Sequence, residues 1–231
     1  MEKITKVALI SLNYLPNTGG LVRYLESLSE SLIDSGVMVD IYCSNGKDES
    51  LKSNEVINQV NIFRESVFDN NFLFKPFTPL AVTYRFFTFF KKYNFDDYDI
   101  VICRHTYPAF ALSLLKNIRN KTVFLIPLAS PKLQAINIKS QPLIKKLYNA
   151  FLIPQLFLLE KYSLKKLKHV GTLSQSKKIE LEGFYGMNDK LKVIAPGVNF
   201  DKFIPREKDE IKLLKDRLVP DSEGKFIYST V

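Results

Sequence analysis

Short apolar runs alternate with helix-like stretches along most of this sequence. Few of the apolar runs alternate strictly between apolar and polar residues, which indicates strands that are buried on both faces. Strands of this kind, joined through helices, predict a parallel sheet covered by helices on both sides. We therefore expect an α/β fold, a Rossmann-like doubly wound sheet that is mainly parallel.

The expected elements follow one another in a regular order. The predicted strands are Lys6–Ser11, Val37–Cys43, Gln59–Arg64, Asp99–Arg104, Thr122–Leu128, His169–Ser174 and Leu191–Pro196. The predicted helices run from Leu21 toward Gly36 and over Thr78–Tyr93, Tyr107–Ile118, Gln141–Lys168 and Gln175–Tyr185. Pro154 is expected to kink or break the fourth of these helices, because proline removes a helical hydrogen bond.

Composition narrows the class of protein. Hydrophobic residues make up 46% of the 231 residues and charged residues 25%, which excludes a globally disordered chain. No apolar run reaches the roughly 18 residues that a membrane-spanning helix needs. Cys43 and Cys103 lie in apolar runs without CxxC spacing, which favours buried thiols in a reducing compartment over a disulfide or a metal site. We expect a cytoplasmic chain that holds no metal.

Two adjacent glycines, Gly19 and Gly20, stand between the first strand and the first helix. Glycine lets a ligand approach the backbone closely, and the free N–H groups at a helix start favour an anion such as phosphate. A tight turn is the competing explanation, and neither GxGxxG nor GxxxxGK[ST] is present to exclude it.

Positive charge is concentrated in one segment, Lys139–Lys178. The segment holds nine lysines and a single acidic residue, Glu160, whereas the whole chain has a net charge of +9. Apolar residues interleave with the lysines, so the segment fits an anionic membrane surface, and we expect peripheral binding at the inner face of the membrane. A core helix with solvated lysines is the alternative.

The lysines proposed to face lipid are Lys145, Lys146, Lys165 and Lys166, and the aromatic residues from Phe86 to Tyr93 are a possible second contact. Nucleic acid is disfavoured, because no nucleic-acid motif accompanies the charge.

Two separated stretches resemble glycosyltransferase family 4, whose members have the GT-B fold. The first is "YLPNTGGLVRYLESLSESLIDSGVMVDIYCS", with a P-x-x-G-G loop between strand and helix. The second runs from "LEKYSLKKLKHVGTLS" to "APGVNFDKFIP", with a glutamate-bearing helix and a P-G-V hinge. The resemblance spans roughly Lys6 to Pro205.

The resemblance implies the acceptor-side, N-terminal domain of a two-domain enzyme. Residues 1–205 would form this domain, and residues 206–231 would be the hinge and the start of a truncated donor-binding domain. The E-x7-E motif of the donor domain is absent, so we expect the chain by itself to be inactive. The partners implied are a nucleotide-diphosphate sugar, a glycan or lipid-linked acceptor, and a donor domain in cis or in trans. The nucleotide sugar is a substrate, so no cofactor is expected.

The resemblance also assigns roles to individual residues. Gly19 and Gly20 would contact the donor phosphate. His105 is the candidate catalytic residue, since a histidine suits proton transfer near neutral pH, although a lone histidine is more often structural and the sequence slightly favours that interpretation. The histidine that many members carry after a later strand is replaced here by Pro127. The candidate acceptor-binding residues are Tyr14, Asn17, Arg23, Arg104, Tyr107 and Ser130.

The function that we expect is transfer of a sugar to a polysaccharide or glycolipid acceptor, with retention of configuration. Two other classes of function stay open from the sequence. One is a non-catalytic subunit of a split transferase, which binds the acceptor or the membrane. The other is a simple nucleotide-binding protein.

Overall fold

The computed structural model describes residues 4–46, 48–68, 77–137 and 142–197, with single residues 207, 209, 210, 213 and 217; for residues 137, 144 and 145 it describes the backbone alone. The chain divides into two compact units, Met1–Pro196 and Gly197–Val231. All that follows concerns the first unit. The hinge residues Val198, Phe203 and Pro205 lie outside the described residues, and so does the side chain of Lys145.

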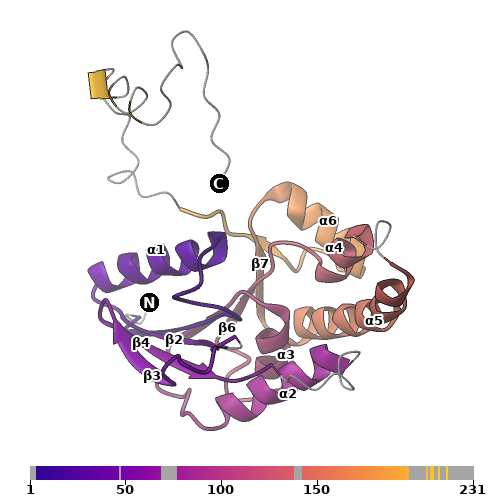
Figure 1. Ribbon diagram of the computed structural model, residues 1–231, viewed down its shortest axis with the longest axis horizontal. Coiled ribbons are helices and arrows are strands. Elements are labelled where there is room, and N and C mark those ends of the chain that lie inside the picture. Colours follow the sequence, from indigo (N-terminus) through magenta and orange to yellow (C-terminus); the bar gives the residue numbers. More distant parts are fainter. Residues whose placement is uncertain are drawn as a thin grey trace. The chain divides into compact units, whose positions relative to one another are not determined.

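The first unit is built on an eight-stranded sheet with the strand order β3-β4-β2-β1-β5-β6-β7-β8. The strands are β1 (Lys6–Ile10), β2 (Met38–Ser44), β3 (Asn54–Ile57), β4 (Val60–Glu65), β5 (Ile100–Cys103), β6 (Thr122–Leu125), β7 (His169–Thr172) and β8 (Lys192–Val193). All neighbouring pairs are parallel except β3 with β4. The expected fold class, a mainly parallel Rossmann-like sheet, is confirmed (Figure 1).

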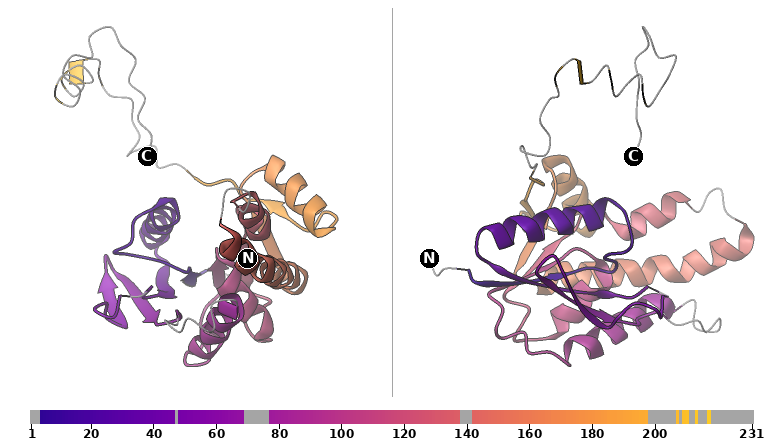
Figure 2. Two further views of the ribbon diagram at one scale, coloured as in Figure 1. Left: turned by 45° about the vertical axis from the view of Figure 1, so that its right-hand side comes forward. Right: turned by 60° about the vertical axis from the view of Figure 1, so that its left-hand side comes forward.

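Helices cover both faces of this sheet. They are α1 (Gly20–Asp34), α2 (Thr78–Phe90), α3 (Thr106–Leu114), α4 (Ser130–Asn137), α5 (Leu143–Lys166) and α6 (Gln175–Tyr185). Figures 1 and 2 show α1 on the opposite side of the sheet from α2 and α3. Among the described residues, no helix is both long enough and apolar enough to cross a membrane.

Strand β1 shows why its sequence is apolar without alternation. Val7 and Leu9 pack toward α1, whereas Ala8 and Ile10 pack into the larger core on the other face. A strand with helices on both sides must bury every side chain, so a continuous apolar run results. Cys43 and Cys103 are buried free thiols, as the sequence indicated.

Three expectations need correction. Phe86, Phe89 and Phe90 are at most 1% exposed and belong to the core, so these three residues do not form the second membrane contact that we considered; Phe87 and Tyr93 are partly buried. The strand β3 and the helix α4 were not predicted. Of the kink or break expected at Pro154, the break is wrong, because α5 is a single helix on both sides of it.

The continuity of α5 has a local explanation. Proline supplies no N–H to the preceding turn, which leaves a backbone carbonyl short of a partner. That carbonyl belongs to Ala150, and the side-chain amide of Gln155 adds a hydrogen bond of 2.9 Å to the next carbonyl, that of Phe151, without replacing the lost one. Leu152 and Leu156, which lie before and after Pro154, are both buried in the first unit. Tertiary packing therefore offsets the cost of the proline.

Candidate active site

A pocket lies at the carboxyl ends of the strands. It has a volume of about 570 Å³. The chain leaves β1 to build one half of the sheet and returns at β5, so β1 and β5 are neighbours at the point where the strand order reverses. Open α/β sheets bind their ligands at this point. The pocket is lined by Gly20, Leu21, Tyr24, Arg104, His105, Thr106, Phe124, Ile126, Pro127, Leu128, Ser130, Leu173 and Pro196.

Four of the residues that the sequence singled out meet in this pocket. Gly20 begins α1, Arg104 and His105 follow β5, and Ser130 begins α4. These residues come from three separate loops, which the sheet gathers along one edge. The convergence was not visible in the sequence, because each loop is separated from the next by a whole strand or helix.

The start of α1 is an open anion site by its geometry. Gly19 caps the helix with φ 149° and ψ 166°, a conformation that is essentially confined to glycine. No side chain caps the helix, and its first turn carries no acidic residue. Its first N–H groups are therefore free of side-chain partners, as a phosphate ligand requires.

The remaining predicted residues lie outside the pocket lining. Tyr14 is buried in the core beneath α1, and Asn17 is an exposed residue whose side-chain amide donates 3.0 Å to the Tyr14 carbonyl. Arg23 is on the solvent side of α1, where it forms an ion pair of 3.2 Å with Glu26. Tyr107 packs its ring 5.0 Å from the His105 ring.

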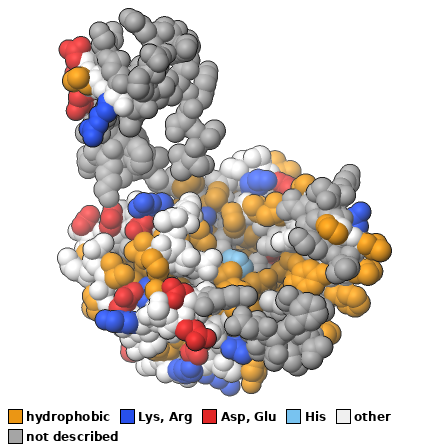
Figure 3. Space-filling model, viewed as in Figure 1, with side chains coloured by type: hydrophobic (Ala, Val, Ile, Leu, Met, Phe, Trp, Pro, Cys, Tyr) orange, Lys and Arg blue, Asp and Glu red, His pale blue; other side chains and the backbone are white. Residues whose placement is uncertain are grey.

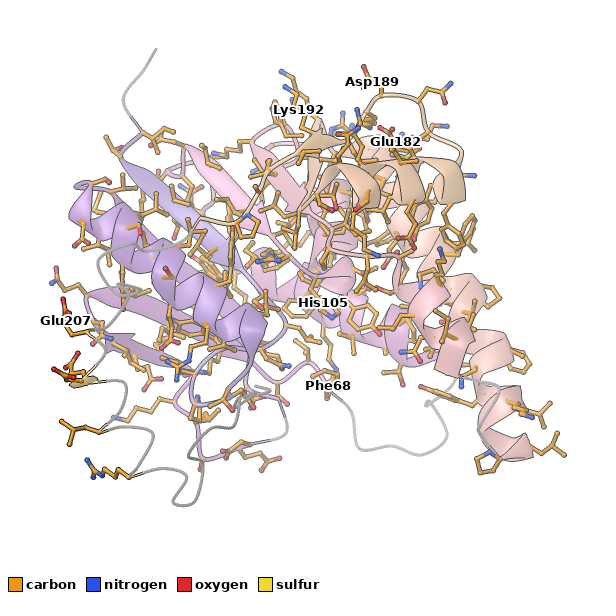
Figure 4. The ribbon with its side chains drawn as sticks, turned by 90° about the horizontal axis from the view of Figure 1, so that it is seen from above. Phe68, His105, Glu182, Asp189, Lys192 and Glu207 are labelled. Carbon is orange, nitrogen blue, oxygen red and sulfur yellow. The ribbon has the colours of Figure 1, made fainter. Side chains whose placement is uncertain are left out.

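His105 lies at the start of α3 and is the imidazole ring of the pocket lining. Figure 4 shows it near the middle of the view, with α1 to its left. Burial lowers the pKa of His105 to about 4, so the imidazole is neutral at pH 7. Its Nδ1 atom is buried and has no hydrogen-bond partner in the part of the chain that the structure describes. One nitrogen of a neutral imidazole accepts a hydrogen bond, and because Nδ1 is buried, a ligand hydroxyl in the pocket would have to reach Nε2.

Arg104 is held against α1. Its guanidinium lies 3.9 Å from the centre of the Tyr24 ring, and burial lowers its pKa from the usual value. The stacking fixes the plane of the guanidinium group at the wall of the pocket.

One buried carboxylate holds two of the pocket-lining residues in place by hydrogen bonds. Glu160 of α5 is 0% exposed. It accepts hydrogen bonds from the Thr106 hydroxyl at 2.6 Å, from the Ser130 N–H at 3.2 Å, and from the Tyr185 hydroxyl. Burial raises the pKa of Glu160, while these hydrogen bonds oppose the shift. The carboxylate thus fixes the first residues of α3 and α4, and both of these residues line the pocket.

The sequence reasoning noted Glu160 without recognising this role. The available signal was its isolation, since it is the single acidic residue between Lys139 and Lys178. Lone acidic residues in apolar helical segments are rarely buried unless they are hydrogen-bonded. Its partners Thr106 and Tyr185 were beyond reach, because they belong to other helices.

Comparison with known proteins decides the family. The family described as glycosyltransferase family 4 matches residues 18–202, which is more than half of the chain. The chain belongs to glycosyltransferase family 4. No curated protein matches the sequence.

Solved structures agree with this family in fold. A sucrose-phosphate synthase from Thermosynechococcus elongatus is similar with a TM-score of 0.62 and 16% identity, over 91% of this chain and 52% of that one. WaaG, a glycosyltransferase involved in lipopolysaccharide biosynthesis, is similar with a TM-score of 0.58 and 14% identity, over 93% and 52%. An α,α-trehalose-phosphate synthase (UDP-forming) from Burkholderia vietnamiensis has a TM-score of 0.53 and 15% identity, over 94% and 55%. The chain therefore spans about half the length of these GT-B enzymes.

Membership of family 4 makes one residue of the pocket unusual. Pro127 lines the pocket at the position where the family resemblance implies a histidine. Proline offers no side-chain hydrogen bond and no proton. His105 lines the same pocket from the neighbouring strand, β5.

Proposed function

We propose that this chain is the acceptor-side, N-terminal domain of a retaining glycosyltransferase. The enzyme moves a sugar from a nucleotide-diphosphate sugar to a polysaccharide or glycolipid acceptor. Residues 1–205 form the domain, and residues 206–231 lead into the donor-binding domain. The observation that carries the proposal is the pocket at the reversal of strand order, where Gly20, Arg104, His105 and Ser130 meet.

The chemistry required of this domain is stabilisation of the leaving diphosphate. The uncapped N-terminus of α1 supplies oriented N–H groups and the positive end of the helix dipole. Such preorganised donors stabilise developing negative charge without having to reorganise. Because Gly19 and Gly20 carry no side chain, the donor phosphates can approach these N–H groups directly.

His105 contributes on the acceptor side. With a pKa of about 4 the ring is neutral, and because Nδ1 is buried, the hydrogen bond from an acceptor hydroxyl falls to the other ring nitrogen, Nε2. In this position it orients the hydroxyl toward the sugar and receives part of its proton in the transition state. The His105 ring thereby takes over the contact that Pro127 cannot make.

The membrane part of the proposal rests on one face of α5. Leu143, Leu147, Phe151 and Leu158 are each 60% or more exposed and recur at helical spacing along this face. A narrow apolar groove of about 470 Å³ lies beside it, between α5, α4 and α6. Figure 3 shows hydrophobic side chains gathered over the part of the molecule where α5 runs in Figure 1.

Lysines lie at the two ends of this apolar face. Lys146 is in the first turns of α5, whereas Lys165 and Lys166 are in its last turn. At a rise of about 1.5 Å per residue these two groups are roughly 28 Å apart, so they flank the apolar face and do not form one patch. Apolar residues flanked by lysines suit a helix that lies in the interface of an anionic membrane.

A transfer assay tests the enzymatic proposal. We expect no sugar transfer by the 231-residue chain alone, and transfer to a bacterial lipid extract when a donor-binding half is supplied in cis or in trans. The donors to test are labelled UDP-, GDP-, ADP- and dTDP-sugars. The Gly20→Ala variant should lose most of the transfer, while Gly183→Ala, an exposed glycine of α6, should retain it. Transfer by the chain alone, or equal activity of both variants, would contradict the proposal.

A further inference from the structure

Arg104 is the charged side chain of the pocket, and its counter-ion is missing from the lining. None of the lining residues is Asp or Glu. Among the described residues, Arg104 forms no ion pair, and its buried Nε atom has no hydrogen-bond partner. Its guanidinium contacts the Tyr24 ring, which holds it in place without neutralising it.

The buried arginine of the same sheet shows the contrast. Arg64 forms an ion pair with Glu55 and donates to the carbonyls of Leu15 at 2.8 Å and Lys52 at 3.3 Å. Within the described part of the chain, the Nε atom of Arg64 is unpartnered like that of Arg104, but the terminal N–H groups of Arg64 are supplied with an anion and with acceptors from the protein itself. Arg104 is half-buried and lacks both, so part of its desolvation is uncompensated.

Glu160, the buried acid that binds two of the lining residues, does not serve as the counter-ion. Its two oxygens already accept hydrogen bonds from Thr106, Ser130 and Tyr185. The anion that Arg104 requires must therefore come from a ligand.

We propose that Arg104 binds an anionic group, a phosphate or a carboxylate, carried by the acceptor. The inference rests on the proposed function, because it places the acceptor in this domain. Arg104 offers a planar fork of N–H donors that fits two oxygens of such a group, and its stacking on Tyr24 keeps the fork oriented. The proposed function assigns the donor diphosphate to the uncapped start of α1, which lies in the same pocket. The acceptor is accordingly an acidic or phosphorylated glycan or glycolipid.

The imidazole signals of His105 report directly on an anion bound at Arg104. The chain has two histidines, so NMR of the imidazole rings gives two sets of signals. His105 lines the pocket next to Arg104, whereas His169 is exposed at the start of β7 and serves as an internal control. An anion bound at Arg104 favours the protonated imidazole, so it should shift the His105 signals and raise the pKa of His105.

The experiment titrates the 231-residue chain with glucose 6-phosphate, glucose, inorganic phosphate and pyrophosphate. We expect glucose 6-phosphate and phosphate to shift the His105 signals at concentrations up to about 10 mM, and glucose to leave them unchanged. Arg104→Gln should weaken the binding about ten-fold or more, as expected for the loss of a charge-assisted hydrogen bond. Arg119→Gln, in the segment between α3 and β6, removes the same charge outside the pocket lining and should bind normally.

The outcomes distinguish an anionic group on the acceptor from the diphosphate of the donor. Binding of pyrophosphate alone, without response to phosphate or glucose 6-phosphate, would assign Arg104 to the donor and overturn the inference. Equal binding by Arg104→Gln and the unmodified chain would also overturn it. The NMR titration does not depend on turnover, so a negative transfer assay would refute the proposed function and leave this result standing.

Discussion

The Glu160 carboxylate accepts a 2.6 Å hydrogen bond from the hydroxyl of Thr106, which lies 54 residues earlier in the chain. This bond ties the middle of the fold to the pocket, because Thr106 begins α3 and lines the pocket wall. The same carboxylate binds the first residue of α4 and the last residue of α6. One side chain therefore sets the relative position of three helix ends.

Replacing Glu160 should destabilise the fold. In Glu160→Gln an amide NH₂ replaces one of two accepting oxygens, and it faces donors from Ser130 and Tyr185. We expect a loss of about 1–3 kcal/mol in the free energy of unfolding, measured by urea denaturation. Glu49→Gln, at an exposed site, is the matched control and should unfold like the unmodified chain. A Glu160→Gln variant as stable as Glu49→Gln would remove Glu160 from its organising role.

Stability should depend on pH through His105. The folded state keeps this ring neutral down to a pKa of about 4, whereas in the unfolded chain it takes up a proton near pH 6.5. Between these values the unfolded state binds more protons, so the stability contributed by the neutral ring is lost as the pH falls. We expect a loss of up to about 3 kcal/mol between pH 6.5 and pH 4.

Two single variants isolate this effect. His105→Gln should flatten the dependence in chemical denaturation series over this pH range, and His169→Gln should not. The same slope in His105→Gln as in the unmodified chain would show that other groups produce it.

The glycines at the start of α1 should respond differently to alanine. Gly19 has φ +149°, so Gly19→Ala should cost about 1–3 kcal/mol of stability through backbone strain. Gly20 has no positive φ, and a Cβ there meets nothing within 4 Å, so Gly20→Ala should change stability by less than about 0.5 kcal/mol. Thermal denaturation measures both effects. Comparable destabilisation by the two variants would mean that Gly20 also has a structural role.

Gly171 of β7 should tolerate no side chain. A Cβ at this position would lie 2.9 Å from Ile194, 3.0 Å from Leu125 and 3.2 Å from the Lys192 carbonyl. Overpacking of this kind costs about 1–3 kcal/mol, so Gly171→Ala should lower the urea midpoint. Gly183→Ala has open space around the new methyl group and serves as the comparison. An unchanged midpoint would indicate that the side chains of Ile194 and Leu125 can move aside freely.

Membrane binding should begin as an electrostatic attraction. Each lysine near an anionic surface contributes about 1 kcal/mol, and salt screens this attraction. Changing Lys145, Lys146, Lys165 and Lys166 to Glu should abolish sedimentation with anionic vesicles at low salt, while neutral vesicles should bind weakly in every case. The control carries the same change of charge at exposed lysines of other elements, namely Lys52, Lys91, Lys116 and Lys192.

The opposite results would identify a solvated helix face. Sedimentation that does not respond to salt, or equal loss in the control variant, would contradict the assignment to α5. Replacing Leu147 and Phe151 with Ser should weaken the binding that remains at higher salt, because the exposed apolar face of α5 supplies that part.

Most of the parallel sheet was predictable, because its strands carry their own signal. Val7 to Ile10 must be apolar at each position when helices cover both faces, and the helix stops at Gly36 and Gly186 have the positive φ that favours glycine. The edge strand β3 was missed because its sequence carries no such apolar signal. Its Asn54–Ile57 sequence is half exposed, and the turn to β4 uses Asn58 and Gln59 at positive φ, without the glycine that usually marks a hairpin.

The sequence by itself determined the fold class, the glycine loop and the resemblance to family 4, since these depend on local spacing and residue type. Only the tertiary structure decided which candidate residues share a site. Gly20, Arg104, His105 and Ser130 meet because parallel strands end at one edge, whereas Arg23 lies on the solvent side of its helix. The stacking of Arg104 on Tyr24 and the contacts of Glu160 were likewise settled by packing, because side chains far apart in a sequence leave no periodic trace of their meeting.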